Sequence, residues 1–164
     1  MDFSKETKIG VIGLGSMGQP IADNIIKAGF HVVVSSRTKK TAEYFKDKAI
    51  IAKSPLDLVK EADTILFVLP TDKEIKEIIT SASKGLRGKT LINLSTISPK
   101  SSVELNKIVK KFGGEYLECL ISGSRKPALD GTLLLLTAGA TEKLNSLTHL
   151  FLSLIHISEP TRPY

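Results

Sequence analysis

The sequence predicts an α/β protein of the doubly wound Rossmann type, with a mostly parallel sheet. Short runs rich in Val, Ile and Leu alternate with stretches of helical periodicity. The first of these runs leads directly into a glycine-rich turn. Strands that are apolar throughout, each followed by a helix, are typical of a parallel sheet covered on both faces, and right-handed crossovers then produce the doubly wound order.

The first half of the chain predicts four strands and the helices between them. The strands are apolar or β-branched runs at residues 7–12, 30–36, 49–52 and 63–70. Residues 16–29 predict a helix that stops at Gly29, and residues 39–47 predict a second helix. Ser54 followed by Pro55 is the pattern of an N-cap and a first helical residue, so a third helix is expected there.

The second half repeats the alternation. A helix is expected over 72–83 and a strand over 89–95. Ser98 and Pro99 repeat the cap-and-proline pattern and open a helix that ends at Gly113 and Gly114. Further strands are expected at 115–119 and 132–139, and Thr141 is expected to cap a last helix over 142–151.

Length and charge limit the possible functions. A chain of 164 residues with ordinary composition predicts one domain, or one domain plus a short extension. The net charge of +6 is compatible with nucleic-acid binding, but the lysines are scattered along helical segments and only 5% of residues are aromatic. A solvated basic surface is therefore favoured, part of which could serve an anionic cofactor. We expect no nucleic-acid partner and, because the apolar runs are short, no membrane partner.

Cys119 is the only cysteine, so no intrachain disulfide can form, and this suits a reducing compartment. The first apolar run lacks the pattern of a secretory signal. We therefore expect a cytoplasmic protein.

The glycine-rich turn has the spacing G-x-G-x-x-G between an expected strand and an expected helix, as the dinucleotide fingerprint requires. The first glycine permits a tight turn, the second lets the backbone approach a pyrophosphate, and the third allows close packing of helix and strand. A plain strand-to-helix turn is the alternative. The predicted cofactor-binding residues here are Gly13, Leu14, Gly15, Ser16, Met17 and Gly18.

The end of the second strand predicts NADP(H) rather than NAD(H). NAD enzymes usually place an acidic residue there for the ribose 2′-hydroxyl, but no carboxylate lies between Val32 and Lys40. Arg37 can bind a 2′-phosphate through its guanidinium, Ser36 and Thr38 can donate hydroxyl hydrogen bonds, and Lys40 adds charge. A solvated basic turn is the alternative.

Later strand ends add further candidates, because ligands of open α/β sheets lie at the carboxyl ends of the strands. Leu69 and Pro70 follow the fourth strand, and Thr96 follows the fifth, near the place expected for a nicotinamide ring. After the sixth strand, Ser122, Gly123 and Ser124 offer hydroxyls and unobstructed N–H groups for a substrate carboxylate. Helix caps and an ordinary turn are the alternatives at these positions.

These motifs together resemble the β-hydroxyacid dehydrogenase family, the group that includes 3-hydroxyisobutyrate dehydrogenase. "IGLGSMGQPIADNIIKAGFHV" is similar to its N-terminal signature, and "SSRTKK" is similar to the turn of its NADPH-using members. "NLSTISPKSS" and "ISGSRKPALDGTLLLLTAG" resemble its later motifs, the last being most similar to the glyoxylate/succinic semialdehyde reductases. Leu120 stands where the family usually has proline.

The resemblance implies a Rossmann domain followed by an all-helical domain, and a homo-oligomeric full-length protein. It implies hydride transfer between NADPH and a small carboxylate-bearing aldehyde or hydroxy acid, with no metal. In the family a lysine in a G-x-x-x-K motif on the helix between the domains donates the proton, and no lysine follows Phe151 here. We therefore assign no catalytic residue within the chain, and we do not give Lys126 of the substrate loop that role.

The last segment, "LSLIHISEPTRPY", resembles nothing at this point in the family. It is similar to the translation of a transposase adapter used in sequencing libraries. We therefore expect residues 1–151 to form an NADP-binding Rossmann domain, residues 152–164 to be a non-native tail, and the C-terminal helical domain to be missing. Three hypotheses remain: the front part of a glyoxylate/succinic semialdehyde reductase, a non-catalytic NADP-binding module, or a sister activity such as that of 3-hydroxyisobutyrate dehydrogenase or an imine reductase.

Overall fold

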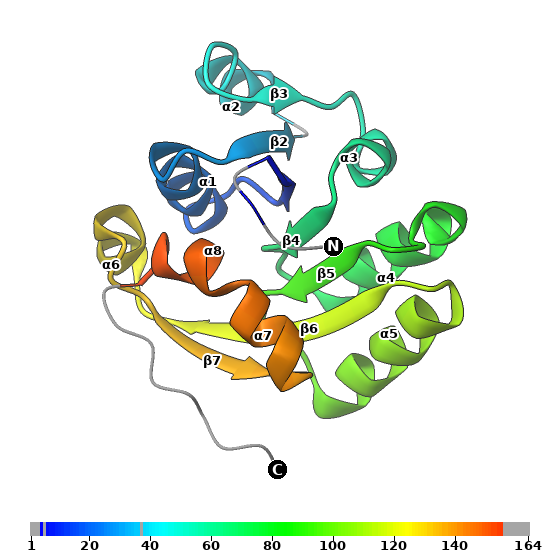
Figure 1. Ribbon diagram of the computed structural model, residues 1–164. Coiled ribbons are helices and arrows are strands. Elements are labelled where there is room, and N and C mark those ends of the chain that lie inside the picture. Colours follow the sequence, from blue (N-terminus) through cyan, green and yellow to red (C-terminus); the bar gives the residue numbers. More distant parts are fainter. Residues whose placement is uncertain (1–3, 5, 37, 156–164) are drawn as a thin grey trace.

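The computed structural model describes residues 4, 6–36 and 38–155, and in this part of the chain seven strands form one sheet in the order β3-β2-β1-β4-β5-β6-β7 (Figure 1). Neighbouring strands are parallel except β6 and β7, which are antiparallel. The predicted doubly wound, mostly parallel sheet is confirmed. The strands are β1 (Lys8–Ile12), β2 (His31–Ser35), β3 (Ile50–Ile51), β4 (Thr64–Phe67), β5 (Thr90–Asn93), β6 (Glu115–Ser122) and β7 (Leu134–Ala138).

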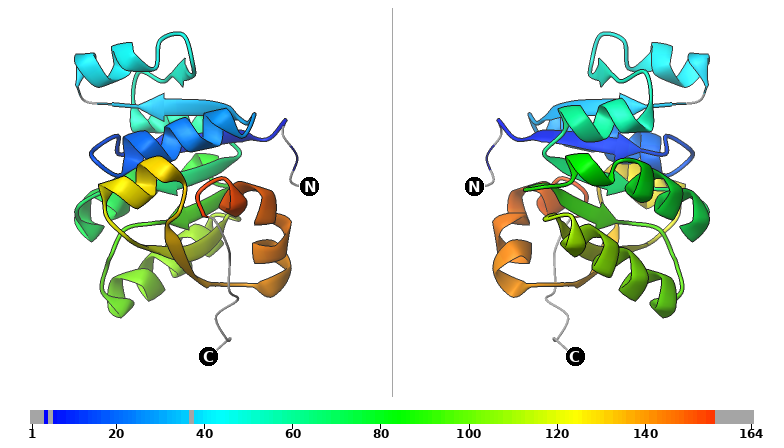
Figure 2. Two further views of the ribbon diagram at one scale, coloured as in Figure 1. Left: turned by 90° about the vertical axis from the view of Figure 1, so that its left-hand side faces the viewer. Right: turned by 90° about the vertical axis from the view of Figure 1, so that its right-hand side faces the viewer.

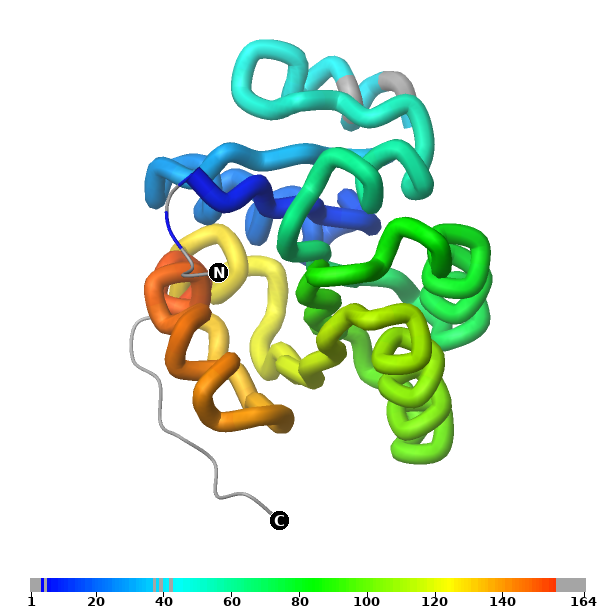
Figure 3. Tube along the Cα trace, turned by 45° about the vertical axis from the view of Figure 1, so that its right-hand side comes forward, coloured from blue at the N-terminus to red at the C-terminus, as the bar shows by residue number. Residues whose placement is uncertain are grey.

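Helices cover both faces of this sheet, as the two side views in Figure 2 show. On one face lie α1, α6, α7 and α8, and on the other lie α3, α4 and α5; the tube in Figure 3 shows the same separation. The helices are α1 (Gly18–Lys27), α2 (Lys39–Tyr44), α3 (Pro55–Glu61), α4 (Asp72–Ser81), the 3₁₀ turn η1 (Ser83–Gly85), α5 (Pro99–Lys111), α6 (Arg125–Asp130), α7 (Thr141–Ser146) and α8 (Thr148–Leu152).

Each central strand supplies side chains to both layers, because successive residues of a strand point to opposite faces. Along β4, Ile65 and Phe67 join the cluster beneath α3, α4 and α5, whereas Leu66 joins the cluster beneath α1 and α8. All three side chains are almost wholly removed from water, and each such burial stabilises the fold by roughly 1.5–3 kcal/mol. This two-sided burial is why the strands carry continuous apolar runs.

Two of the three expected N-caps are present. Ser54 Oγ accepts a hydrogen bond from Asp57 N (3.1 Å), and Ser98 Oγ accepts one from Ser101 N (3.1 Å). The prediction that Thr141 caps the last helix is wrong, since Ala140 is the N-cap residue and makes no side-chain cap bond. The single helix expected over 142–151 is two helices, because Leu147 leaves the helical conformation (ψ 5°) while remaining wholly buried.

The region after β5 differs most from the sequence-based expectation. Strand β6 extends to Ser122, three residues beyond the predicted end, and α6 was not predicted. Helix α6 has only six residues, contains a proline and ends at Gly131 in the left-handed conformation (φ 67°), so the sequence indicated a loop. Tertiary contact stabilises it, since Asn24 Nδ2 of α1 donates a hydrogen bond to Ala128 O (2.7 Å).

The predicted domain boundary at Phe151 falls inside α8. Beyond this helix, Leu154 and Ile155 are buried in the cluster beneath α1, and Leu133 N donates a hydrogen bond to Leu154 O (3.2 Å). Residues 156–164 lie outside the described residues, and the non-native origin of 152–164 stays a prediction.

No helix in the described part of the chain is long and apolar enough to span a membrane.

Candidate functional site

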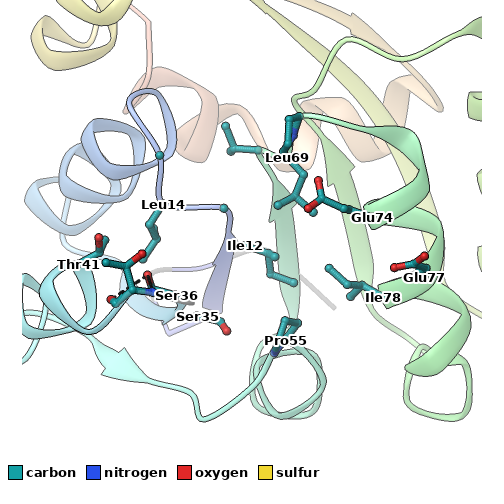
Figure 4. Close-up of a pocket in the computed structure, with 15 residues that line it drawn as sticks. Ile12, Leu14, Ser35, Ser36, Thr41, Pro55, Leu69, Glu74, Glu77 and Ile78 are labelled. Atoms are coloured by element: carbon teal, nitrogen blue, oxygen red, sulfur yellow. Dashed lines mark hydrogen bonds between the residues drawn. The ribbon is translucent and has the colours of Figure 1, made fainter.

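A cleft of about 450 Å³ lies at the carboxyl ends of β1, β2 and β4. It lies where the strand order reverses, between β1 and β4, which is the ligand position expected for open α/β sheets. Figure 4 shows its two walls, the fingerprint turn and the β2–α2 segment on one side and α4 on the other. The lining residues are Ile12, Gly13, Leu14, Gly15, Ser35, Ser36, Thr38, Thr41, Pro55, Val68, Leu69, Pro70, Glu74, Glu77 and Ile78.

The three fingerprint glycines have different surroundings. Gly13 has a positive φ of 98°, and a Cβ there would lie 2.1 Å from Val68 O of the neighbouring β4 turn. A Cβ on Gly18 would lie 1.7 Å from Gly13 O. A Cβ on Gly15 would meet no atom within 4 Å. Packing within the protein therefore requires Gly13 and Gly18, whereas Gly15 leaves free space of the kind a pyrophosphate needs.

Helix α1 begins immediately after this turn and points its N-terminus toward it. Its first turn contains no acidic residue, and its N-cap residue Met17 makes no side-chain cap bond. The helix dipole favours a bound anion at this end. The turn and helix thus fit a dinucleotide phosphate, although Ser16, Met17 and Gly18 do not themselves line the cleft.

The β2–α2 segment forms the wall predicted to select the cofactor. Ser36 Oγ accepts a hydrogen bond from Thr38 N (3.1 Å) and donates one to Thr38 O (3.2 Å), so this hydroxyl shapes the turn. Ser36 and Thr38 both line the cleft, whereas Lys40 is exposed and does not. Arg37 lies outside the described residues.

Sequence reasoning missed the opposite wall. Glu74, Glu77 and Ile78 of α4 face the Ser36 side of the cleft in Figure 4, and Pro55 forms part of its base. Their spacing of three and four residues places them on one helix face, and this was the signal that could have identified them. The carboxylates that line the cleft therefore come from α4 and none comes from the β2 end.

The ends of β5 and β6 are not part of this cleft. Thr96 is exposed after β5, and Ser122, Gly123 and Ser124 are exposed at the end of β6, further along the same edge of the sheet. Gly123 has a positive φ of 141°. The structure therefore gathers Gly13, Leu14, Gly15, Ser36, Thr38, Leu69 and Pro70 in one cleft and leaves the other predicted residues that it describes outside it.

Lys126 and Cys119 both lie outside the cleft. Lys126 Nζ contacts Asp130 Oδ2 (2.8 Å) within α6, and this hydrogen bond raises the pKa of Lys126. Burial raises the pKa of Cys119 to about 12. Among the described residues, no group of three or more His, Cys, Asp or Glu side chains could hold a metal ion.

Comparison with known proteins agrees with the geometry of the cleft. Residues 8–156 match the family described as the NAD binding domain of 6-phosphogluconate dehydrogenase. The mitochondrial 3-hydroxyisobutyrate dehydrogenase of Rattus norvegicus is 34% identical over 84% of this chain and 42% of its own length. The chloroplastic glyoxylate/succinic semialdehyde reductase 2 of Arabidopsis thaliana is 36% identical over 80% of this chain and 38% of its own length. The chain thus spans less than half the length of these relatives.

A solved structure supports the fold. The 3-hydroxyisobutyrate dehydrogenase of Mycobacterium tuberculosis, determined with L-serine, superimposes with a TM-score of 0.88 at 24% identity, over 94% of this chain and 54% of that one. The resemblance that the motifs predicted is confirmed for the N-terminal domain. This chain belongs to the family of the NAD binding domain of 6-phosphogluconate dehydrogenase.

Proposed function

We propose that this chain is the NADP(H)-binding domain of an oxidoreductase whose full-length form reduces a small carboxylate-bearing aldehyde, of the glyoxylate or succinic semialdehyde type, to the hydroxy acid. The observation that carries the proposal is the cleft at the β1/β4 reversal, with free space at Gly15 and no carboxylate on its β2 wall. The Arabidopsis relative, whose name states this reductase activity, supports the substrate class.

The preference for NADP(H) rests on the β2–α2 segment. A carboxylate there would repel a 2′-phosphate, and the lining residues Ser36 and Thr38 bring hydroxyl and amide groups instead. We assign Arg37 and Lys40 to the same phosphate, because Arg37 lies between these two hydroxyl residues in the sequence and Lys40 follows them closely. Leu69 and Pro70 would contact the cofactor on the nicotinamide side of its pyrophosphate, because they line the cleft beside Gly13 and follow β4, on the far side of β1 from β2.

When bound, NADPH supplies the hydride for carbonyl reduction. We assign Ser122, Gly123 and Ser124 to the substrate carboxylate and Thr96 to the region of the nicotinamide, because all four residues follow strands β5 and β6 at the carboxyl edge of the sheet. Such a reduction also needs a proton donor beside the carbonyl oxygen. We place that donor in the part of the full-length protein that follows this domain.

Titration of the chain with NADPH and NADH tests the cofactor assignment. We expect wild-type chain to bind NADPH at least tenfold more tightly than NADH. The Arg37→Asp variant should lose about tenfold in NADPH affinity and far less in NADH affinity, because an acidic residue would repel the 2′-phosphate. Arg87→Asp is the control, since Arg87 is exposed and lies outside the cleft. Equal affinities of the wild-type chain for the two cofactors would contradict the assignment.

A second candidate activity is oxidation of 3-hydroxyisobutyrate, which the 34% identity to the rat enzyme favours. Assays of the full-length protein with glyoxylate, succinic semialdehyde and 3-hydroxyisobutyrate separate the two activities by their relative kcat/KM. NADPH binding without turnover of any of the three would favour a non-catalytic module.

We also propose that the full-length protein is a homo-oligomer and is located in the cytoplasm. Analytical ultracentrifugation tests the oligomeric state, and cell fractionation tests the location.

A further inference from the structure

We infer that Ser95 is a positioning residue for the nicotinamide half of the cofactor, acting through the β4 turn, and that Asn93 supports it in this role. The inference rests on the proposed function. Ser95 and Asn93 are both buried at the end of β5, with 7% and 0% of their surfaces exposed, and neither lines the cleft. Buried polar side chains of this kind are retained where their hydrogen bonds define a local backbone geometry.

The hydroxyl of Ser95 connects β5 to the turn that follows β4. Ser95 Oγ accepts a hydrogen bond from Leu69 N (2.9 Å) and donates one to Phe67 O (3.3 Å). Leu94 N also donates to Phe67 O (2.9 Å), as the ladder between the two strands requires. The Ser95 hydroxyl therefore continues the hydrogen bonding between β4 and β5 beyond the regular ladder, to the backbone N–H group of Leu69.

The hydrogen bond between Ser95 and Leu69 connects β5 to a residue that lines the cofactor cleft. Leu69 and Pro70 line the cleft, and a Cβ on Gly13 would meet Val68 O at 2.1 Å and the Leu69 side chain at 3.0 Å. Because the Gly13 turn and the β4 turn are in close contact, a displacement of Leu69 would change the width of the cleft beside the fingerprint. Ser95 thus determines the width of the cleft beside the fingerprint, although it does not line the cleft.

The side chain of Asn93 forms hydrogen bonds with both backbone polar groups of Ser95, its N–H and its carbonyl. Ser95 N donates a hydrogen bond to Asn93 Oδ1 (3.0 Å), and Asn93 Nδ2 donates one to Ser95 O (2.9 Å). The carbonyl of Ser95 belongs to the peptide bond that leads into Thr96. One buried amide therefore fixes both the Ser95 hydroxyl and the start of the Thr96 segment, which we assign to the nicotinamide region.

The test compares the binding of NADPH with the binding of adenosine 2′,5′-bisphosphate, a ligand that contains only the adenosine half of the cofactor. NADPH spans both halves of the site, whereas adenosine 2′,5′-bisphosphate occupies only the half toward β2, on the far side of β1 from the Ser95 contact. We expect Ser95→Ala to weaken NADPH binding about tenfold and to change adenosine 2′,5′-bisphosphate binding less than twofold. Ser95→Thr, which keeps the hydroxyl, should bind NADPH within about threefold of the wild-type chain.

A matched control separates positioning from a general loss of stability. Ser98→Ala removes a hydroxyl three residues away that caps α5 and does not line the cleft, so it should weaken neither ligand. Hydrogen exchange supplies a local measurement. In Ser95→Ala the Leu69 amide should exchange about tenfold faster, whereas the Val68 amide, which donates to Ile12 O, should keep its rate.

The outcomes distinguish this inference from the proposed function. If the wild-type chain binds neither NADPH nor NADH, the proposed function fails and the inference fails with it. If the wild-type chain binds NADPH and Ser95→Ala binds it equally well, only the inference is overturned. Equal losses for NADPH and adenosine 2′,5′-bisphosphate, or a loss of the same size in Ser98→Ala, would also overturn it, because the effect would then be one of stability alone.

Discussion

Gly13, Gly15 and Gly18 are alike in the sequence and differ in what surrounds them. Side chains at Gly13 or Gly18 would overlap with backbone oxygens, so substitutions there would damage the fold before any effect on a ligand could be measured. Gly15 faces free space within the cleft. It is therefore the position at which ligand binding can be separated from folding.

We predict that Gly15→Ala binds NADPH about tenfold or more weakly, because the new methyl group occupies space that the pyrophosphate requires. The free energy of unfolding should stay within about 0.5 kcal/mol of the wild-type value, since the methyl group meets no protein atom. Fluorescence titration and urea unfolding measure the two quantities. Gly85→Ala, which also meets no atom within 4 Å but lies outside the cleft, is the control and should leave binding unchanged.

Tyr116 carries a buried hydroxyl that completes no hydrogen bond among the described residues. Burial raises the pKa of Tyr116 to about 12, and nearby Ser102 and Asn93 oppose this shift only in part. Below pH 10 the phenol is neutral in both the folded and the unfolded chain. Between pH 10 and about 12 the unfolded chain loses this proton first, so the fold loses stability as the pH rises through this range.

We predict that Tyr116→Phe keeps the unfolding free energy at pH 7 within about 1 kcal/mol of the wild-type value, because the lost hydroxyl has no complete hydrogen bond. The variant should also lose less stability than the wild-type chain between pH 10 and about 12. Urea unfolding across this pH range is the measurement. An unchanged slope in Tyr116→Phe would contradict the prediction.

At the scale of elements, the end of α3 depends on a residue from another part of the chain. Lys89 Nζ donates hydrogen bonds to Ala62 O (2.6 Å) and Lys60 O (3.2 Å), and the cation lies at the negative end of the helix dipole. Partial burial lowers the pKa of Lys89, so these contacts are made at some cost in desolvation. Helix α3 covers β1 and β2, next to the cleft.

We predict that Lys89→Met lowers the free energy of unfolding by about 1–2 kcal/mol, because the partly buried Ala62 carbonyl and the exposed Lys60 carbonyl lose a charged donor. Chemical denaturation of the free chain measures this loss. Lys84→Met is the matched control, since Lys84 is exposed on η1, and it should change stability by less than about 0.5 kcal/mol. A loss of equal size in both variants would show that the α3 contact is not responsible.

The elements also show where local patterns were sufficient. Ser54–Pro55 and Ser98–Pro99 begin helices as predicted, because a cap and the residue after it act within one turn. Thr141 carries the same kind of side chain but lies inside α7, and α6 forms over residues that indicated a loop. For α6, packing of Ala128 in the cluster beneath α1 overrides the local preference.

At the scale of the whole molecule, strand β7 is an exposed edge of the sheet within the described residues. Leu134 and Leu136 are 48% and 42% exposed, and they alternate with buried Leu135 as strand geometry requires. An edge strand with exposed leucines promotes association between chains. The opposite edge, β3, also exposes apolar side chains, those of Ile50 and Ile51.

We predict that the double variant Leu134→Lys/Leu136→Lys associates less than the wild-type chain at the same concentration, because charges on an edge strand disfavour strand pairing. Sedimentation velocity at several concentrations measures this difference. Val103→Lys is the control, since Val103 is 54% exposed on α5, away from this edge. NADPH affinity should be unchanged in all three chains, and a monomeric wild-type chain at high concentration would contradict the prediction.

The sequence by itself determined the fold class, the fingerprint turn and the order of the strands and of helices α1 to α5. These features depend on local periodicity and on glycine geometry, which neighbouring residues are enough to specify. The tertiary structure alone decided the antiparallel direction of β7, the formation of α6 and the wall of the cleft that carries Glu74, Glu77 and Ile78. It also decided the hydrogen bonds from Ser95 to the β4 turn, which join residues 26 and 28 positions apart. No local pattern encodes such contacts, because they exist only once two strands lie side by side.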